Sequence, residues 1–253
     1  MEQGIALDIS FDGDPHAARG ALEGRFPGVD AVLQVESDRR RTLLIADMDS
    51  TMITVECIDE LADYAGIKPQ IAAITEAAMR GELDFAAALD ARVALLAGMD
   101  ERVIERCLEE RVRIMPGAPA LVRTMRAHGA TAILVSGGFT RFAEPVAREI
   151  GFDRAIANVL EVADGRLTGT VMRPIVDAET KLATLQAAGR AHEATLAVGD
   201  GANDLPMIRA AGLGVAYHAK PVVAAAAGAR IDHNDLTALL YAQGYARADW
   251  VTA

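Results

Sequence analysis

Short apolar runs alternate with helix-length segments through most of this chain, and that alternation constrains the fold more than any other feature. Residues 41–46, 131–135 and 195–198 are apolar runs without polar alternation, as expected for strands buried on both faces of a parallel sheet. Helical patterns lie between and around them, at residues 118–128, 139–150 and 178–188. The sequence therefore predicts an α/β fold with a Rossmann-like parallel sheet and right-handed β-α-β connections.

Residues 56–111 interrupt this alternation with an all-helical pattern. Apolar residues recur there at three- and four-residue spacing in four segments separated by glycines, which indicates amphipathic helices. We therefore predict a helical cap inserted into a core made of residues 41–55 and 112–253. Within that core, residues 155–170 are expected to form a hairpin with its turn at Asp164-Gly165, and short strands are expected around Val215 and Ile231.

The first forty residues have a pattern of their own. Residues 5–11 alternate like a strand, residues 16–25 are helix-like, and residues 31–35 are again strand-like. We predict a small N-terminal β-α-β extension that packs on the rest of the chain, because a fragment of residues 1–40 is small for an independent domain.

Composition disfavours several classes of partner. The formal net charge of −11 argues against nucleic acid, since phosphate neutralisation needs clustered Lys and Arg, and the basic run at residues 39–41 reads as a solvated lead-in to a strand. No apolar stretch approaches the ~18 residues of a membrane span, and Glu2 stands where a signal peptide would be basic. Cys57 and Cys107 are too few for a disulfide framework, so we expect reduced thiols and a cytoplasmic location.

An acidic pair ends the first core strand. Asp47 and Asp49 are two residues apart, so both carboxylates can point into one pocket beyond the carboxyl end of the sheet. Two such carboxylates can bind Mg²⁺, and one of them can attack phosphorus to form a phosphoaspartate. An acidic surface turn is the alternative reading of the spacing by itself.

A glycine-rich turn follows the second core strand. Ser136 comes directly after an apolar run and is followed by Gly137, Gly138 and a predicted helix. A hydroxyl together with free backbone N–H groups at a helix N-terminus can bind phosphate. An ordinary β-α turn is the alternative.

Two later segments add a cation and more carboxylates. Lys181 lies near the start of a predicted helix, and Asp200, Asn203 and Asp204 lie in the loop at residues 199–204, which closes another strand. Asp200 and Asp204 suit a second set of Mg²⁺ ligands. A surface lysine and a polar turn are the separate alternatives, but the order of acidic pair, hydroxyl, lysine and acidic pair favours one phosphate-processing site.

These segments together resemble the four motifs of the haloacid dehalogenase (HAD) superfamily of phosphatases, and within it the phosphoserine phosphatase family. The resemblance runs from residue 41 to the end of the chain, and its fold is the HAD type of Rossmann-like core with a helical cap. It implies Mg²⁺-dependent hydrolysis of O-phosphoserine to serine and phosphate through a phosphoaspartyl intermediate, the last step of serine biosynthesis. The matching motifs are residues 47–51 (D-M-D-S-T), residues 136–139 (S-G-G-F), Lys181 and residues 199–204 (G-D-G-A-N-D).

The resemblance also implies a role for each motif residue. Asp47 would be the nucleophile, and Asp49 would be the general acid and then the general base. Ser136, Gly137 and Lys181 would hold the phosphoryl group. The remaining roles concern the metal: Mg²⁺ would be bound by Asp47, the backbone carbonyl of Asp49, and Asp200, with Asn203 and Asp204 in support.

In the cap, the resemblance identifies four substrate-binding residues. Glu56 matches a glutamate that contacts the serine ammonium, and Arg92 matches an arginine that pairs with the serine carboxylate. Met79 and Phe85 match apolar residues that screen the closed site from water. Without the resemblance, Glu56 would read as a helix cap, Arg92 as an exposed helix charge, and the two apolar residues as plain core.

Two other functions share part of this pattern. A phosphotransferase would pass the phosphoryl group from phosphoserine to an alcohol such as homoserine with the same residues. A signalling receiver also combines Asp, Mg²⁺ and Lys, but receivers are about half this length and lack the cap. The expected partner is a small phosphomonoester, phosphoserine, rather than nucleic acid or membrane, and the sequence leaves open whether the chain forms a homodimer.

Overall fold

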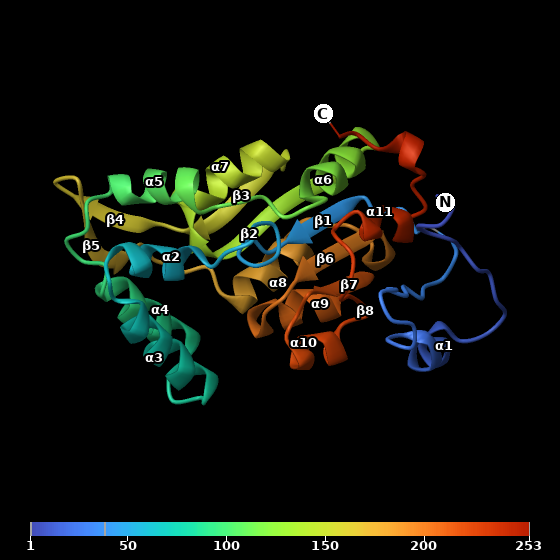
Figure 1. Ribbon diagram of the computed structural model, residues 1–253, viewed down its shortest axis with the longest axis horizontal. Coiled ribbons are helices and arrows are strands. Elements are labelled where there is room, and N and C mark those ends of the chain that lie inside the picture. Colours follow the sequence, from blue (N-terminus) through green and yellow to red (C-terminus); the bar gives the residue numbers. More distant parts are fainter. Residues whose placement is uncertain (1, 38, 253) are drawn as a thin grey trace.

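A six-stranded parallel sheet forms the centre of the molecule (Figure 1). The computed structural model describes residues 2–37 and 39–252. The strand order is β3-β2-β1-β6-β7-β8, so the first strand in the chain lies in the middle, as expected for a doubly wound α/β core. The strands are β1 (Leu43–Ala46), β2 (Thr131–Phe139), β3 (Arg154–Asn158), β6 (Thr195–Gly199), β7 (Leu213–Tyr217) and β8 (Ala229–Ile231).

The central strand β1 shows why the sheet is buried on both faces. Leu44 and Ala46 pack into one apolar cluster, and Leu43 and Ile45 pack into another, because successive side chains point to opposite faces. The first cluster is covered by α6 (Ala118–Ala127), α7 (Thr140–Ile150) and α11 (Ala238–Ala242), and the second by α8 (Ala178–Ala187), α9 (Leu205–Ala210) and α10 (Pro221–Ala226). The predicted α/β class is confirmed.

The helical insert lies at one end of the sheet (Figure 1). All four predicted segments are helical: α2 (Cys57–Tyr64), α3 (Lys68–Met79), α4 (Phe85–Ala94) and α5 (Arg102–Glu110). A hairpin of β4 (Leu160–Ala163) and β5 (Arg166–Val171), whose turn is at Asp164-Gly165 as predicted, packs against them. The backbone N–H of Gly98 donates to the Leu167 carbonyl at 2.8 Å, so this hairpin belongs spatially with the insert.

The two chain passages that lead into and out of the insert lie side by side. Ile53 and Ile114 form an antiparallel bridge. The N–H of Thr54 donates to the Arg113 carbonyl at 3.0 Å, and the N–H of Met115 donates to the Met52 carbonyl at 2.9 Å. The chain therefore enters and leaves the insert through one narrow, hydrogen-bonded double passage, and side chains of the insert also pack into the same apolar cluster as those of the core.

The N-terminal prediction is half wrong. The helix exists as α1 (Pro15–Leu22), but residues 5–11 and 31–35 form no strand. Ile5, Leu7 and Ile9 are each at least 69% exposed. Alternation alone does not make a strand, because a strand needs the backbone of a neighbour to pair with, and the described part of the chain offers none there.

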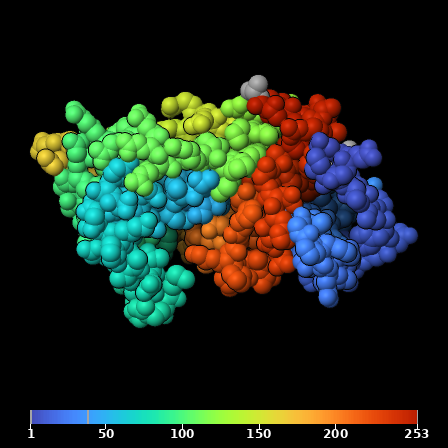
Figure 2. All heavy atoms as spheres, viewed as in Figure 1, coloured from blue at the N-terminus to red at the C-terminus, as the bar shows by residue number. Residues whose placement is uncertain are grey.

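The N-terminal extension instead packs against the C-terminal part of the core (Figure 2). Its helix lies near the edge strand β8: Arg19 donates to the Ala227 carbonyl, and Glu23 pairs with Arg230 at 3.4 Å. Asp30 accepts from the N–H groups of Asp232 and Asn234 at 2.8 and 2.9 Å. The extension therefore covers part of a sheet edge that would otherwise be open to another chain.

Asp30 is expected to anchor this extension in a pH-dependent way. Burial raises the pKa of its carboxyl, but hydrogen bonds from Asp232, Asn234 and His233 outweigh burial and lower that pKa below its ordinary value of 3.8. Because the pKa of Asp30 is lower in the folded protein than in the unfolded protein, Asp30 stabilises the fold at pH values above its unfolded pKa. This stabilisation is lost as the pH falls through its folded pKa. Asp30→Ala is expected to reduce the free energy of unfolding by about 1–2 kcal/mol at pH 7.

Denaturant unfolding of wild type and Asp30→Ala between pH 7 and pH 3 measures this effect. The difference in the free energy of unfolding between wild type and Asp30→Ala should shrink toward zero as the pH approaches 3. Asp12→Ala is the control, because Asp12 is exposed and has no hydrogen bond among the residues described. Equal stability of wild type and Asp30→Ala at pH 7 would show that Asp30 is not an anchor.

Three smaller expectations need correction or confirmation. Arg41 is buried rather than solvated, and its guanidinium donates to Gln34 Oε1 at 2.6 Å, because the N-terminal extension covers it. Cys57 and Cys107 are buried free thiols. Within residues 2–37 and 39–252, none of the helices is long and apolar enough to cross a membrane.

Candidate active site

The predicted site residues from three strand ends meet at the carboxyl edge of the sheet. Asp47 follows β1, Ser136 lies on β2, and Asp200 follows β6. Because β1 pairs with both β2 and β6, parallel strands deliver all three side chains to the same edge. Asp47 is only 5% exposed, which makes its carboxylate costly to leave without a partner.

Lys181 supplies that partner. It lies in the first turns of α8, whose N-cap Asp177 accepts from the Thr180 N–H at 2.8 Å, and its side chain is completely buried. Lys181 Nζ donates to Asp47 Oδ1 and to Asp204 Oδ1, each at 2.6 Å. Burial alone would lower the pKa of Lys181, but Asp204 and Asp47 outweigh it and raise that pKa, so the ammonium stays charged.

A cluster of carboxylates lies around this lysine. One oxygen each from Asp47, Asp200 and Asp204 falls within 4.8 Å of the others. Burial, then the charge of Asp204, raises the pKa of Asp200 to about 6, and the same two causes raise the pKa of Asp47 well above its ordinary value. Both causes disfavour the charged carboxylates, and a bound cation would offset the like-charge part. The cluster can hold a metal ion.

Asp204 is more central than predicted. Its Oδ1 accepts from Lys181, and its Oδ2 accepts from the Gly201 N–H at 3.0 Å. A Cβ at Gly199 would collide with the Asp204 carboxyl group, so the close approach of this loop to the strand end requires glycine there. Asn203 is half-buried beside Gly201.

Asp49 lies in a different electrostatic environment from Asp47. Burial, followed by the charge of Glu56, raises the pKa of Asp49 to about 7, and its Oδ1 accepts from the Cys57 N–H at 3.4 Å. Its Oδ2 lies 2.9 Å from the position of a Cβ at Gly138, next to the second strand end. A carboxyl with this pKa can exchange a proton near neutral pH.

The expected turn at residues 136–138 is instead part of a strand. The strand β2 continues to Phe139, with a register shift against β3 between Val135 and Phe139. This irregularity orients the polar groups of residues 136–138 toward the site. Ser136 is 1% exposed, and its Oγ accepts from the Gly138 N–H at 2.9 Å, so its own O–H remains to donate to a ligand.

Two predicted residues of the insert face this site. Glu56, the N-cap of α2, accepts from Ser50 Oγ at 2.7 Å, and its charge acts on Asp49 and Asp200. Arg92 on α4 is half-buried, with Nε donating to the Ala88 carbonyl at 3.2 Å. Burial lowers the pKa of Arg92, against the opposing charges of Asp59, Glu56 and Asp49.

The two predicted apolar residues differ. Phe85, at the start of α4, has its ring 3.2 Å from the position of a Cβ at Gly137, and so it lies over the Ser136 strand end. Met79 is the last residue of α3 and is 71% exposed. The tip of the insert, where α3 ends, projects away from the core (Figure 2), so Met79 screens nothing in this arrangement.

Sequence reasoning missed two polar residues beside the site. Thr51 is fully buried, with Oγ1 3.4 Å from Asp200 Oδ1. Asn158, the last residue of β3, is 1% exposed and donates to the Gly137 carbonyl at 2.8 Å. The sequence predicts a hairpin over residues 155–170, but residues 155–158 belong to β3 of the main sheet, and only the position of Asn158 at the end of that strand could have signalled its role.

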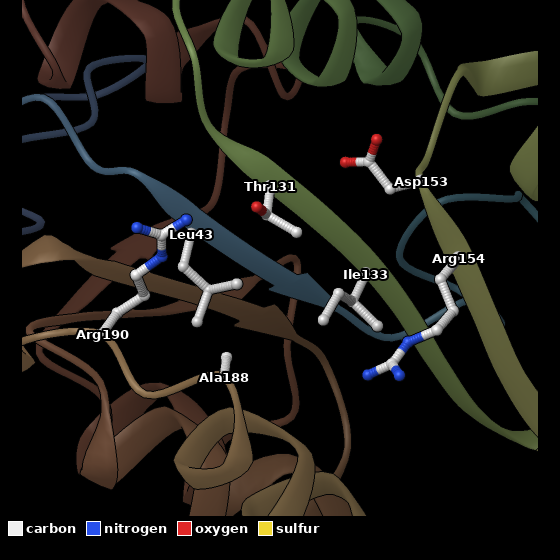
Figure 3. A pocket seen from close by; sticks show the side chains of 7 residues that line it. All are labelled: Leu43, Thr131, Ile133, Asp153, Arg154, Ala188 and Arg190. Atoms are coloured by element: carbon white, nitrogen blue, oxygen red, sulfur yellow. The ribbon is translucent and has the colours of Figure 1, made fainter.

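A separate cavity of about 290 Å³ lies at the other end of the strands (Figure 3). Leu43 and Thr131, the first residues of β1 and β2, line it together with Ile133, Arg154 and Arg190. None of the predicted site residues lines this cavity, which therefore does not belong to the carboxylate cluster.

The fold and the site together define a hydrolase class. The haloacid dehalogenase-like hydrolase family matches residues 44–209, a span that runs from β1 to the loop of Asp200 and Asp204. The chain belongs to this family.

Known relatives are phosphatases. A phosphoserine phosphatase of Streptomyces coelicolor is 46% identical over 253 residues, covering 96% of this chain and 62% of that protein. A phosphoserine phosphatase of Mycobacterium tuberculosis is 47% identical over 215 residues, covering 83% of this chain and 52% of that protein. The chain thus spans little more than half the length of these two relatives. The crystal structure of a probable phosphoserine phosphatase from Vibrio cholerae superposes with a TM-score of 0.76 at 37% identity, covering 94% of this chain and 75% of that chain.

Proposed function

We propose that this protein hydrolyses phosphoserine to serine and phosphate. The observation that carries the proposal is the buried ion-pair network in which Lys181 Nζ lies 2.6 Å from both Asp47 and Asp204, next to Asp49 with its raised pKa. A nucleophile, a group that can donate a proton and a buried cation are what phosphoryl transfer to a carboxylate requires. The likeness to phosphoserine phosphatases supports the choice of substrate.

The reaction proceeds in two displacements, in which Asp47 is the nucleophile and Asp49 donates and accepts the protons. Lys181 holds Asp47 Oδ1, which leaves Oδ2 to attack phosphorus. The bond from phosphorus to the serine oxygen breaks, and Asp49 gives its proton to that oxygen. Asp49 then takes a proton from water as the water attacks the phosphoaspartate, which releases phosphate and restores the Asp47 carboxylate.

The phosphoryl oxygens are held by groups from two elements, the end of β2 and the start of α8. Ser136 offers its O–H, the strand end at Gly137 offers backbone N–H, and Lys181 offers the ammonium proton that is not directed at a carboxylate. Preorganised donors of this kind stabilise the charge that develops in the transition state.

The carboxylate cluster fits Mg²⁺, because its donors are hard oxygens that lie close together, and because burial and then the charge of Asp204 raise the pKa values of Asp47 and Asp200. Asp47, Asp200 and the backbone carbonyl of Asp49 would hold the ion, with Asp204 and Asn203 in support. When bound, Mg²⁺ supplies positive charge at the phosphoryl oxygens.

In this proposal, residues 56–111 act as a specificity cap over a catalytic core of residues 41–55 and 112–253. Glu56 would contact the ammonium of the substrate and Arg92 its carboxylate, while Phe85 would exclude water. Support comes from the charges: Arg92 and Glu56 both act electrostatically on Asp49, so an acid and a base lie near the leaving-group side of the site.

A screen of small phosphomonoesters tests this function. Phosphate release should be fastest with phosphoserine in the presence of Mg²⁺ and should fall at least about 100-fold after chelation. An added alcohol such as homoserine should not become phosphorylated. Turnover that is equal for all esters would reject the substrate assignment, and transfer to homoserine would indicate a phosphotransferase.

Arg92→Ala is expected to raise KM for phosphoserine roughly 10- to 100-fold, because a charge-assisted hydrogen bond to carboxylate is worth about 1.5–3 kcal/mol. KM for p-nitrophenyl phosphate, which has no carboxylate, should change less than about threefold. Arg102→Ala is the matched control, since Arg102 is an exposed arginine on α5 of the same insert. Equal effects of Arg92→Ala on both substrates would remove Arg92 from substrate recognition.

A further inference from the structure

Asn158 occupies a position that joins two halves of the phosphate-binding region. It is the last residue of β3 and is almost completely buried. Its Nδ2 donates to the Gly137 carbonyl at 2.8 Å, and its Oδ1 accepts from the Val176 N–H at 2.7 Å. Nδ2 also lies 3.5 Å from the Val176 carbonyl. One side chain therefore bridges two segments that are about forty residues apart in the chain.

On the Gly137 side, the contact fixes one peptide unit at both of its ends. The carbonyl of Gly137 and the N–H of Gly138 belong to the same planar peptide. Asn158 donates to that carbonyl, and the N–H of Gly138 donates to Ser136 Oγ at 2.9 Å. Because the peptide is planar, Asn158 fixes the orientation of the donor that holds the Ser136 hydroxyl.

On the Val176 side, the contact fixes the start of α8. Val176 is buried and directly precedes Asp177, the N-cap of the helix that carries Lys181. The backbone of Lys181 donates to the Asp177 carbonyl at 3.1 Å. A shift of this segment would therefore move Lys181 relative to Asp47.

The irregular end of β2 explains why a side chain is needed here. The register between β2 and β3 shifts between Val135 and Phe139, so the ladder leaves backbone groups near Gly137 without their regular partners. A buried carbonyl or N–H without a hydrogen bond is costly. The amide of Asn158 offers both a donor and an acceptor, and it satisfies Gly137 and Val176 together.

We propose that Asn158 is a positioning residue. It holds the Ser136 hydroxyl and the Lys181 ammonium in the relative positions in which both can bind one phosphoryl group. This inference rests on the proposed phosphatase function and concerns how its phosphate site is assembled. Asn158 touches no reacting atom and acts through the peptide at Gly137 and through the start of α8.

Inorganic phosphate is the probe for the test, with Asn158→Ala and the milder Asn158→Ser as variants. A serine side chain is shorter than that of asparagine, so we expect its hydroxyl to replace only part of this bridge. The inhibition constant for phosphate should rise about tenfold or more in Asn158→Ala, with Asn158→Ser in between, and kcat should fall by a similar factor with both phosphoserine and p-nitrophenyl phosphate.

Gln243→Ala is the matched control for lost stability. Gln243 is a fully buried amide that also bridges backbone groups, accepting from the Arg41 N–H and donating to the Leu239 carbonyl, each at 3.0 Å, and it makes no contact with the site. The Tm of Gln243→Ala should fall as much as the Tm of Asn158→Ala. The inhibition constant of Gln243→Ala for phosphate should stay within about twofold of wild type.

Unchanged phosphate inhibition and kcat in both Asn158 variants, or the same changes in Gln243→Ala, would overturn the inference. A failure of this inference can be distinguished from a failure of the proposed substrate. If wild type hydrolyses p-nitrophenyl phosphate but not phosphoserine, the proposed substrate is wrong, and the comparison of Asn158 variants still decides the positioning role.

Discussion

Asp47→Asn is expected to lower kcat by on the order of 10³-fold or more while leaving the fold intact. The amide oxygen of asparagine is a poor nucleophile, and removal of a nucleophile eliminates the covalent route. The fold should survive because burial and Asp204 raise the pKa of Asp47, so a neutral group of the same shape removes an unfavourable charge. Lys181 keeps Asp204 as its partner.

Two measurements check this expectation. Steady-state kinetics gives the loss of turnover, and intact mass after rapid acid quenching shows whether the chain carries a phosphoryl group. Wild type should show a phosphorylated fraction and Asp47→Asn should show none. Asp47→Ala is the control for slow deamidation of the introduced asparagine to aspartate, which would restore activity in Asp47→Asn. An Asp47→Asn variant within about tenfold of wild-type kcat would exclude Asp47 as the nucleophile.

Lys181→Met is expected to have the second large effect, on stability as well as on turnover. The substitution keeps the length of the side chain but removes a completely buried ammonium, and the carboxylates of Asp47 and Asp204 lose their shared partner. Removing one member of a buried ion pair costs about 3–5 kcal/mol. Turnover should be lost together with this stability.

The pH dependence identifies the cause of that loss. Without Lys181, the folded pKa of Asp47, which is already raised, lies further above its unfolded value, and this penalises the folded state at high pH but not below the unfolded pKa. The stability deficit of Lys181→Met should therefore shrink as the pH falls from 7 toward 4, without added divalent cation. A deficit that is constant with pH would point to packing instead. Lys220→Met, at an exposed lysine near the same loop, is the control.

Features whose pattern repeats along the chain could be predicted from the sequence. The central strand β1, the helices of the insert and the strand end at Asp47 follow from periodicity and from the acidic pair, and the structure confirms each of these elements. The cluster of Asp47, Asp200 and Asp204 follows from strand order, because parallel neighbours end at one edge.

Features that depend on pairing partners could not be predicted. Residues 5–11 alternate like a strand, yet remain unpaired, because periodicity does not reveal whether a neighbour exists. Strand β2 runs through Ser136 and Gly137 instead of turning, because β3 continues to support it with the side chain of Asn158. Met79 is exposed, because the position of the tip of α3 depends on how the insert packs.

The double passage at Ile53 and Ile114 has a consequence for how such proteins can diversify. Since the insert leaves and re-enters the core at adjacent, hydrogen-bonded points, segments of different length can connect the same two points of the chain. Recombination or engineering can exchange that segment as a cassette, and a short loop could join the two points directly. The segment between these two points and the core around it can thus vary separately within one gene.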